Sequence, residues 1–259
     1  MEYRNKKVLV IGLARSGMAA IKLLNKLGAQ ITLSERKEPT KEELKALYDS
    51  KVSSSVQITA MDLSGIETYG SGFVIRKGFV ATTWSLFLKF LSNANHIYIN
   101  DAKGNTYNID GIVAANTSYD IVILKLSEEA LDNVTFEKTN TLKTDDNLFI
   151  INSKINSTFR INYGRFVSLE NGKLKNLFPL TEADNGAAIF NSKGNVVAFA
   201  TSDILSSELS YANSTDYLID LQKILLNQSY DEINPEYEDD GIIMKADIQK
   251  DEWDENIPI

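Results

Sequence analysis

Short strand-like segments separated by glycine turns recur through the middle of the chain, and this pattern constrains the fold more than any other feature. Turn signals stand at 103–105 (Lys-Gly-Asn), 171–172 (Asn-Gly) and 193–195 (Lys-Gly-Asn), each flanked by alternating or β-branched residues. Helical spacing interrupts the strands at 83–92 and 217–227. Regular short strands with such turns are typical of closed β structures. The sequence therefore predicts a mainly β body over residues 51–227.

Three segments within this body stand in a characteristic order. Gly-Ser-Gly-Phe-Val-Ile at 70–75 leads into Gly-Phe-Val-Ala-Thr-Thr-Trp-Ser at 78–85, Tyr-Asp-Ile-Val-Ile-Leu-Lys-Leu follows at 119–126, and Asp-Asn-Gly-Ala-Ala-Ile-Phe-Asn follows at 184–191. In order and spacing they resemble landmarks of trypsin-like peptidases of the bacterial HtrA type, over about residues 52–205. The resemblance implies a trypsin-like double β-barrel, with two six-stranded halves that meet near Asn140.

The same resemblance locates the catalytic positions of the family. It places Ser85 at the histidine, Asp120 at the orienting aspartate and Asn185 at the nucleophilic serine. A serine becomes nucleophilic when an adjacent imidazole takes its proton, and neither Ser85 nor Asn185 can serve either role. Alanines at 183 and 187 replace glycines of the family's oxyanion-hole loop, which makes unusual backbone angles there costlier. We therefore expect no intact catalytic set, and a module that binds peptide or protein rather than an enzyme.

Two unconventional routes to catalysis stay open. The one histidine, His96, lies where Ile97 and Ile99 alternate with polar residues, which predicts the wetter face of a half-buried strand rather than the site of Asp120. A serine–lysine pair is possible in principle, although no spacing singles one out. The alternative function is a serine-type endopeptidase relative with residual or unconventional activity.

The beginning of the chain has a different pattern. An apolar run at 7–13 ends in a glycine-bounded turn, helical spacing follows at 18–27, Gly28 is a helix stop, and 29–34 predicts a second strand. A second helix is expected after Thr40, with Glu43 completing a capping box. Together these elements predict a βαβα, Rossmann-like fragment over residues 1–50.

This fragment also resembles a known family. Val-Leu-Val-Ile-Gly-Leu-Ala-Arg-Ser-Gly at 8–17 is similar to the N-terminus of UDP-N-acetylmuramoylalanine–D-glutamate ligase, where this part holds the uridine nucleotide. The resemblance implies that Gly12, Ser16 and Gly17 face phosphate and that Glu35 approaches the nucleotide. Alternatively, the glycines only permit a tight turn, because Ala14 interrupts the Gly-x-Gly-x-x-Gly fingerprint. Binding of a uridine nucleotide-sugar through residues 7–50 is thus a further alternative function, and we expect no cofactor.

Composition limits the other classes of site. With 259 residues, 43% of them hydrophobic, the chain has room for a substantial core. It has no cysteine and one histidine, which excludes disulfides and thiolate metal sites and argues against a histidine-based zinc site. No EF-hand spacing is present, so no metal site is expected.

The net charge of −8 is concentrated at the C-terminus. Residues 228–259 contain eleven acidic residues and two lysines, which leaves a net charge of +1 for the remainder. Such a composition predicts a solvated, disordered tail. However, Ile-Ile-Met at 242–244 and Trp253 leave open a docking role, on a basic partner or back on the chain's own barrel.

Charge and hydropathy also bear on partners and location. No basic stripe with interleaved aromatic residues is present, so nucleic acid is not an expected partner. No apolar stretch is long enough for a membrane span, and the first residues fit a strand and turn better than a signal peptide. We therefore expect a cytoplasmic protein.

Overall fold

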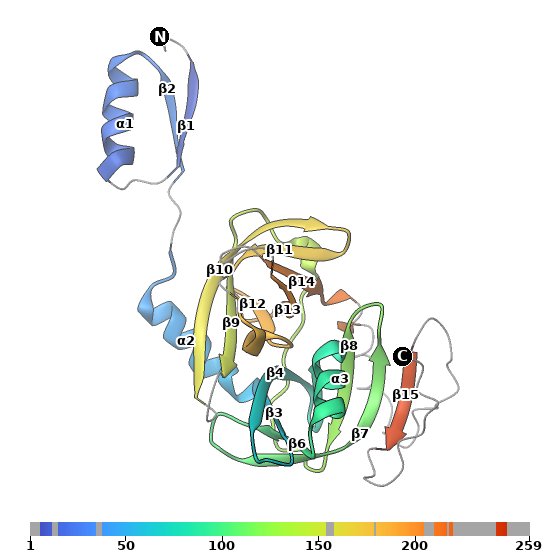
Figure 1. Cartoon of the computed structure of the whole chain (residues 1–259). Coiled ribbons are helices and arrows are strands. Elements are labelled where there is room, and N and C mark those ends of the chain that lie inside the picture. The colour runs from blue at the N-terminus through green and yellow to red at the C-terminus, as the bar shows by residue number, and fades with distance from the viewer. Residues whose placement is uncertain are drawn as a thin grey trace. The chain divides into compact units, whose positions relative to one another are not determined.

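The computed structural model describes residues 6–11, 15–34, 38–153, 158–178, 180–204, 210–216, 218–219 and 242–247. The chain divides between Thr40 and Lys41 into two compact units (Figure 1). None of the helices in the described part has the length and apolar character that crossing a bilayer requires.

The first unit is a single strand–helix–strand motif. It consists of β1 (Lys7–Ile11), α1 (Arg15–Lys26) and β2 (Gln30–Ser34), and the two strands pair in parallel. Gly28 ends the helix with φ at 78°, a left-handed conformation that glycine adopts without steric cost. The strand–helix–strand part of the predicted βαβα fragment is confirmed, whereas the helix expected after Thr40 belongs to the second unit. Gly12 and Glu35, and the side-chain surroundings of Ser16 and Gly17, lie outside the described residues, so their nucleotide-binding role stays a prediction.

The second unit begins with α2 (Lys41–Lys51), which leads through a short 3₁₀ turn, η1 (Val52–Ser54), into the β body. Leu44, Leu47 and Tyr48 of α2 pack against a core of this unit, and the Tyr48 hydroxyl donates to the carbonyl of Phe159 at 3.4 Å. These contacts attach α2 to the β body. The predicted three-part division at residues 50 and 227 stays a prediction.

Six strands close the first barrel, in the order β7-β6-β3-β4-β5-β8, with β7 pairing back onto β8. They are β3 (Ser55–Met61), β4 (Glu67–Arg76), β5 (Phe79–Thr82), β6 (His96–Asn100), β7 (Thr106–Asn116) and β8 (Ile121–Leu126). The helix α3 (Trp84–Asn93) confirms the helical segment expected at 83–92. Its buried face, Leu86, Phe87 and Phe90, packs on the interior of this barrel.

Six further strands form the second closed barrel, in the order β10-β11-β14-β13-β12-β9. They are β9 (Asn147–Ser153), β10 (Phe159–Glu170), β11 (Lys173–Leu177), β12 (Ala188–Asn191), β13 (Val196–Ile204) and β14 (Ser210–Ser214). Short 3₁₀ turns, η2 (Thr139–Thr141) and η3 (Glu182–Asp184), precede β9 and β12. Asn171 and Gly172, with φ of 52° and 77°, form the predicted hairpin turn between β10 and β11.

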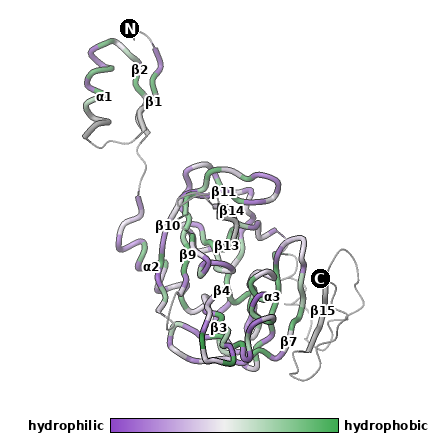
Figure 2. The backbone as a smooth tube through the Cα atoms, in the orientation of Figure 1, coloured by the Kyte–Doolittle hydropathy of each residue, from purple (hydrophilic) through white to green (hydrophobic). Residues whose placement is uncertain are grey.

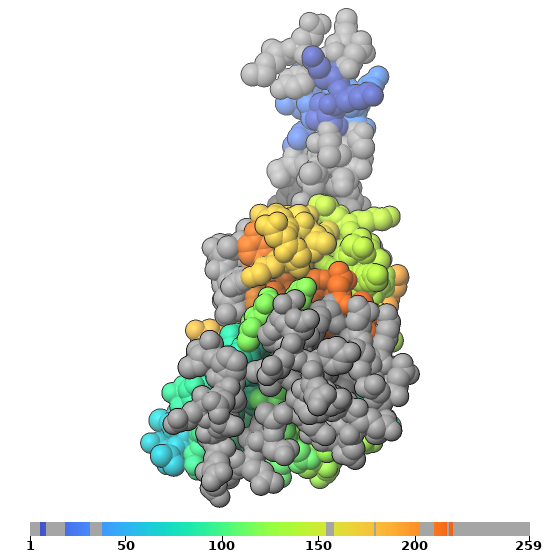
Figure 3. Space-filling view, turned by 90° about the vertical axis from the view of Figure 1, so that its right-hand side faces the viewer, coloured from blue at the N-terminus to red at the C-terminus, as the bar shows by residue number. Residues whose placement is uncertain are grey.

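Alternation along the strands sorts the apolar side chains into three cores. Two fill the barrels, and a third lies between them, where Phe73 of β4 meets Phe199 of β13 with ring centroids 6.4 Å apart. Figure 2 shows hydrophobic and hydrophilic stretches interleaved along the barrel strands, and in Figure 3 the second barrel, yellow to orange, lies against the cyan-to-green first barrel. The predicted fold, a mainly β double barrel with a small α/β piece before it, is confirmed.

The C-terminal tail contributes one described element. β15 (Ile242–Asp247) pairs antiparallel with β7, so these six residues lie on the chain's own barrel. The rest of the tail, and the helix expected at 217–227 apart from Leu218 and Ile219, lie outside the described residues. Leu218 is fully buried in the core between the barrels.

Candidate functional site

The structure joins Ser85 and Asp120 at the beginning of α3. The Ser85 backbone N–H donates to Asp120 Oδ1 at 2.7 Å, and its hydroxyl donates to Asp120 Oδ2 at 3.0 Å. Asp120 lies in the turn between β7 and β8, where its φ is 47° and its N–H donates to the carbonyl of Thr117. A carboxylate that accepts an N–H in the first helical turn is a stabilising cap. Asp120 therefore holds the N-terminus of α3.

Asn185 is tied to the same helix end through Thr83. Thr83 is the N-cap residue of α3 by position, but its side chain does not cap the helix. Its hydroxyl donates instead to Asn185 Oδ1 at 2.9 Å, and both side chains are buried. The three residues predicted from the sequence are thus gathered around the start of α3, with Asp120 bonded to Ser85 and Asn185 bonded to Thr83.

The loop before β12 is held in a closed 3₁₀ turn. Thr181 and Asp184 form a capping box around η3, and the Asn185 N–H donates to the carbonyl of Glu182 at 3.1 Å. Gly186 has φ at 86°, and a Cβ on it would lie 2.1 Å from the carbonyl oxygen of Ser71. The N–H groups of residues 184–186 all donate to protein carbonyls. None of these three groups points free toward a bound ligand.

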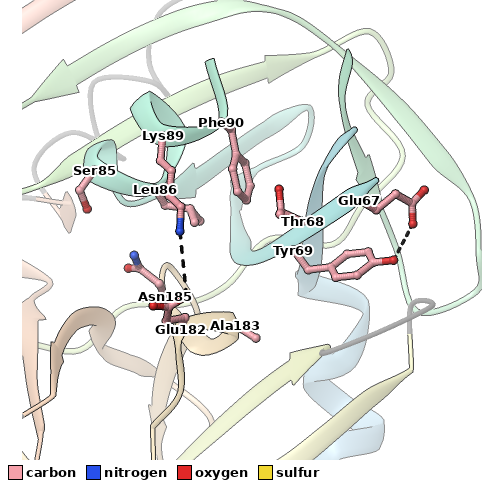
Figure 4. Close-up of a pocket in the computed structure, with 10 residues that line it drawn as sticks. All are labelled: Glu67, Thr68, Tyr69, Ser85, Leu86, Lys89, Phe90, Glu182, Ala183 and Asn185. Atoms are coloured by element: carbon pink, nitrogen blue, oxygen red, sulfur yellow. Dashed lines mark hydrogen bonds and ion pairs between the residues drawn. The ribbon is translucent and has the colours of Figure 1, made fainter. Parts of the chain in front are cut away.

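A cavity of about 520 Å³ opens beside these residues (Figure 4). Its lining comes from β4, α3 and the η3 loop: Glu67, Thr68, Tyr69, Ser85, Leu86, Lys89, Phe90, Glu182, Ala183 and Asn185. Leu86 and Phe90 give it an apolar wall. Lys89 Nζ lies 4.0 Å from Glu182 Oε2, and both side chains are largely exposed, so this ion pair contributes little to stability. The arrangement is a cleft with an apolar wall and a charged rim.

One end of the cleft is fixed by a carboxylate and two phenols. Glu67 accepts hydrogen bonds from the hydroxyls of Tyr69, at 2.5 Å, and Tyr98, at 2.6 Å. These bonds lower the pKa of Glu67, while burial and the bond to Glu67 raise the pKa of Tyr98 to about 12. The group therefore stays a fixed carboxylate–phenol cluster at neutral pH.

No motif in the sequence marks Glu67, Tyr69 or Lys89 as residues of the cleft. A usable signal was their position, since residues 67–69 directly precede the Gly-Ser-Gly-Phe landmark and Lys89 lies one helical turn after Ser85.

His96 lies on β6, as predicted, on the opposite face from the fully buried Ile99. Its ring lies against that of Tyr98, with centroids 5.4 Å apart, and both side chains are partly exposed. The Asp120 carboxylate is bonded to Ser85 instead. In the described part of the chain, no three His, Asp or Glu side chains gather closely enough to hold a metal ion.

Solved structures of other proteins share the fold. Deg5 aligns with a TM-score of 0.60 and 20% identity, covering 71% of this chain and 94% of Deg5. The serine endoprotease from Yersinia pestis aligns with a TM-score of 0.60 and 17% identity, covering 74% of this chain and 69% of that chain. At this level of identity the likeness shows a common fold.

Curated relatives match different lengths of the chain. Anti-sigma-I factor RsgI9 of Acetivibrio thermocellus is 26% identical over 186 residues, which are 70% of this chain and 26% of the relative. UDP-N-acetylmuramoylalanine–D-glutamate ligase of Staphylococcus aureus is 33% identical over 99 residues, 37% of this chain and 22% of the ligase. The ligase of Lacticaseibacillus casei is 57% identical over 37 residues, 14% of this chain and 8% of the ligase. The chain spans about a quarter or less of the length of these relatives.

The part of the chain that matches a known family includes strands of both barrels and most residues that line the cleft. The family described as trypsin-like peptidase domain matches residues 70–199, which begin in β4 and end in β13 and include Ser85, Asp120 and Asn185. This match extends over half of the chain and agrees with the double-barrel architecture. The chain belongs to the trypsin-like peptidase domain family.

Proposed function

We propose that this chain is a trypsin-like module without peptidase activity that binds an extended polypeptide in the cleft beside α3. The observation that carries the proposal is the bonding of the three catalytic positions. Asp120 holds Ser85 at a helix end, and Asn185 bonds to Thr83, next to a cavity of about 520 Å³. The site thus has an open cavity, while the polar side chains at the three positions form hydrogen bonds within the protein.

The chemistry of the pair Ser85–Asp120 supports the loss of catalysis. Acyl transfer needs a base that takes the nucleophile's proton and then returns it to the leaving group. A carboxylate is far too weak a base to deprotonate a serine hydroxyl by itself. The amide of Asn185 is neither a base nor a nucleophile in this role.

The closed η3 turn supports the same conclusion independently. A tetrahedral oxyanion needs preorganised N–H donors close to the nucleophile. The N–H of Asn185, at the nucleophile position, already donates to the carbonyl of Glu182. The N–H of Asn185 would donate to an oxyanion only after the η3 turn changed its conformation.

The outer edge of β4 supports binding of an extended chain. β5 pairs with β4 only from Phe73 to Arg76, and the Ser71 N–H next to this stretch donates to the carbonyl of Asn185. Among the described strands, none covers the same edge at 67–69, which lines the cleft. Strand edges of this kind bind peptides by main-chain hydrogen bonds, with side-chain pockets providing specificity. One matched relative is also named as an anti-sigma-I factor rather than as a peptidase.

The loss of catalysis is tested with a fluorophosphonate probe. We expect no labelling of the full chain under conditions that label trypsin completely. Labelling that disappears in Ser85→Ala would contradict the proposal and favour a residual serine peptidase.

Binding in the cleft is tested by selecting displayed random peptides against the full chain. Thr68→Trp places a large side chain on the exposed, cleft-lining stretch of β4, and we expect it to weaken a selected peptide at least ~10-fold, about 1.4 kcal/mol. Arg160→Trp, at an exposed position of β10, is the matched control and should leave affinity unchanged. Failure to select any peptide, or equal affinities in both variants, would contradict a cleft-based function.

A second candidate function belongs to the first unit. Its parallel strand–helix–strand motif, together with the 57% identity of the chain to a ligase over 37 residues, supports binding of a uridine nucleotide. Calorimetry of the full chain with UDP should then show saturable heat that Gly17→Val abolishes and Asn25→Ala, on the same helix, preserves. Absence of heat with UDP and with UDP-sugars would remove this candidate.

A further inference from the structure

The second half of β7 has neighbours on both edges, and one of them comes from the tail. Residues 111–116 pair with β8 on one edge, whereas β6 pairs with β7 only at 106–108. Along residues 111–116 of the other edge β15 pairs with β7 instead, from Ile242 opposite Asn116 to Asp247 opposite Gly111. Figure 1 shows β15 alongside β7 at the side of the first barrel. Without the tail, this stretch of β7 would be an open strand edge among the described elements.

The sequence of this edge is that of a central strand. Residues 111–116 read Gly-Ile-Val-Ala-Ala-Asn, with no charge and no proline. Val113 packs in the core between the barrels and Ile112 in the interior of the first barrel, so both faces are buried. Natural edge strands usually carry charges or prolines that discourage pairing with other chains. Residues 111–116 contain neither charges nor prolines. We therefore expect another strand to pair with this edge.

The segment that covers it is the one apolar triplet of an otherwise acidic tail. Ile-Ile-Met at 242–244 is preceded by Glu-Asp-Asp at 238–240, whereas charges of both signs follow it, with Lys245 and Asp247 inside β15. Apolar residues within a strand favour pairing, and the run of like charges before the triplet discourages the addition of another copy of the same segment. The tail therefore combines a pairing segment with an acidic run that opposes its association with further copies.

We propose that the outer edge of β7 at residues 111–116 is a strand-acceptor site, and that Ile242–Asp247 of the same chain is its exchangeable occupant. The pairing uses main-chain hydrogen bonds, so the site selects an extended segment in antiparallel register. The 22 residues at 220–241 tether the occupant, and tethering supplies an effective concentration of ~1 mM. A strand pairing that is too weak to persist between separate molecules therefore forms within one chain.

Hydrogen–deuterium exchange of the full chain tests this assignment. Ladder hydrogen bonds alternate along a strand, so one of two adjacent residues of β15 donates to β7. We expect at least one of the variants Ile243→Pro and Met244→Pro to speed exchange of the outward-facing amides of 111–116 by ~10-fold or more. Amides of β9 should keep their protection, and Lys250→Pro, outside β15, should leave β7 unchanged.

A synthetic peptide of residues 240–248, added in excess to the affected proline variant, should restore protection of the same β7 amides. Unchanged β7 exchange in both proline variants, or no response to the peptide, would overturn the proposal. Protection in the native chain that disappears on dilution would assign the strand to a second copy and would overturn the intramolecular pairing. Residues 111–116 are not part of the cleft lining, so these results are independent of the cleft-binding experiments.

Discussion

At the scale of single residues, the hydrogen bonds of a few polar side chains determine the geometry of the site. Asp120 accepts from the backbone and side chain of Ser85, and Thr83 gives its hydroxyl to Asn185 instead of to its own helix. Asp120 therefore stabilises the start of α3. We expect its removal to lower the stability of the chain.

Asp120→Ala should lower the free energy of unfolding by ~1–2 kcal/mol, because the Ser85 N–H loses its acceptor at the start of α3. Urea denaturation of the full chain measures the change. Asp110→Ala, which removes an exposed carboxylate paired with Lys125 at 3.6 Å, should cost no more than ~0.5 kcal/mol. Equal costs in the two variants would show that Asp120 does not cap the helix.

Glu137 provides a prediction about pH. Hydrogen bonds from Asn195, Lys193 and Asn191 lower its pKa from 4.5 to about 2 and tie the segment between the barrels to the β12–β13 turn. A carboxyl with a lowered pKa contributes stability that is present above its unfolded-state pKa and is lost as the pH falls through its folded-state pKa.

Glu137→Gln should therefore destabilise the protein at pH 7, and the difference from the native chain should shrink as the pH falls from about 4.5 toward 2. Urea unfolding of both proteins at pH 7 and pH 3 measures it. A difference that is the same at both pH values would show that the ionised carboxylate is not the source.

At the scale of elements, local patterns predicted the strands, turns and helix well. The Asn171-Gly172 turn, the alternation around His96 and the helix after Thr83 were all confirmed, because each depends on neighbouring residues. The bonds that define the site join residues far apart in sequence, 35 positions for Ser85–Asp120 and 102 for Thr83–Asn185. Such bonds follow from barrel closure and cannot be obtained from local periodicity.

The loop before β12 depends on one glycine. Gly186→Ala combines a left-handed φ with a Cβ 2.1 Å from the Ser71 carbonyl oxygen, so we expect it to cost ~3 kcal/mol or more. Gly104→Ala has a similar φ, 85° against 86°, but open space around the added Cβ, and should cost only ~1 kcal/mol. Thermal or urea unfolding compares them, and equal losses would contradict the close packing of this loop on β4.

At the scale of the whole molecule, two closed barrels hold a cleft beside which the Asn185 N–H already donates to the carbonyl of Glu182. We therefore expect that restoring a histidine and a serine at the proposed catalytic positions is not sufficient for peptidase activity. The double variant Ser85→His, Asn185→Ser should remain inactive toward a casein substrate, because the N–H at position 185 still donates to Glu182. Activity above that of the native chain, removed by a further Asp120→Ala substitution, would show that the η3 turn does not limit catalysis.

We propose that the cleft binds an extended polypeptide and does not cut it, and mass spectrometry tests both parts together. A peptide selected for binding to the cleft is incubated for a long period with an equal amount of the full chain. The native chain and the Thr68→Trp variant are incubated in parallel, and the peptide is then examined by mass spectrometry. We predict an intact peptide that co-elutes with the native chain and not with Thr68→Trp. Cleavage products that form with the native chain and are lost with Ser85→Ala would contradict the account.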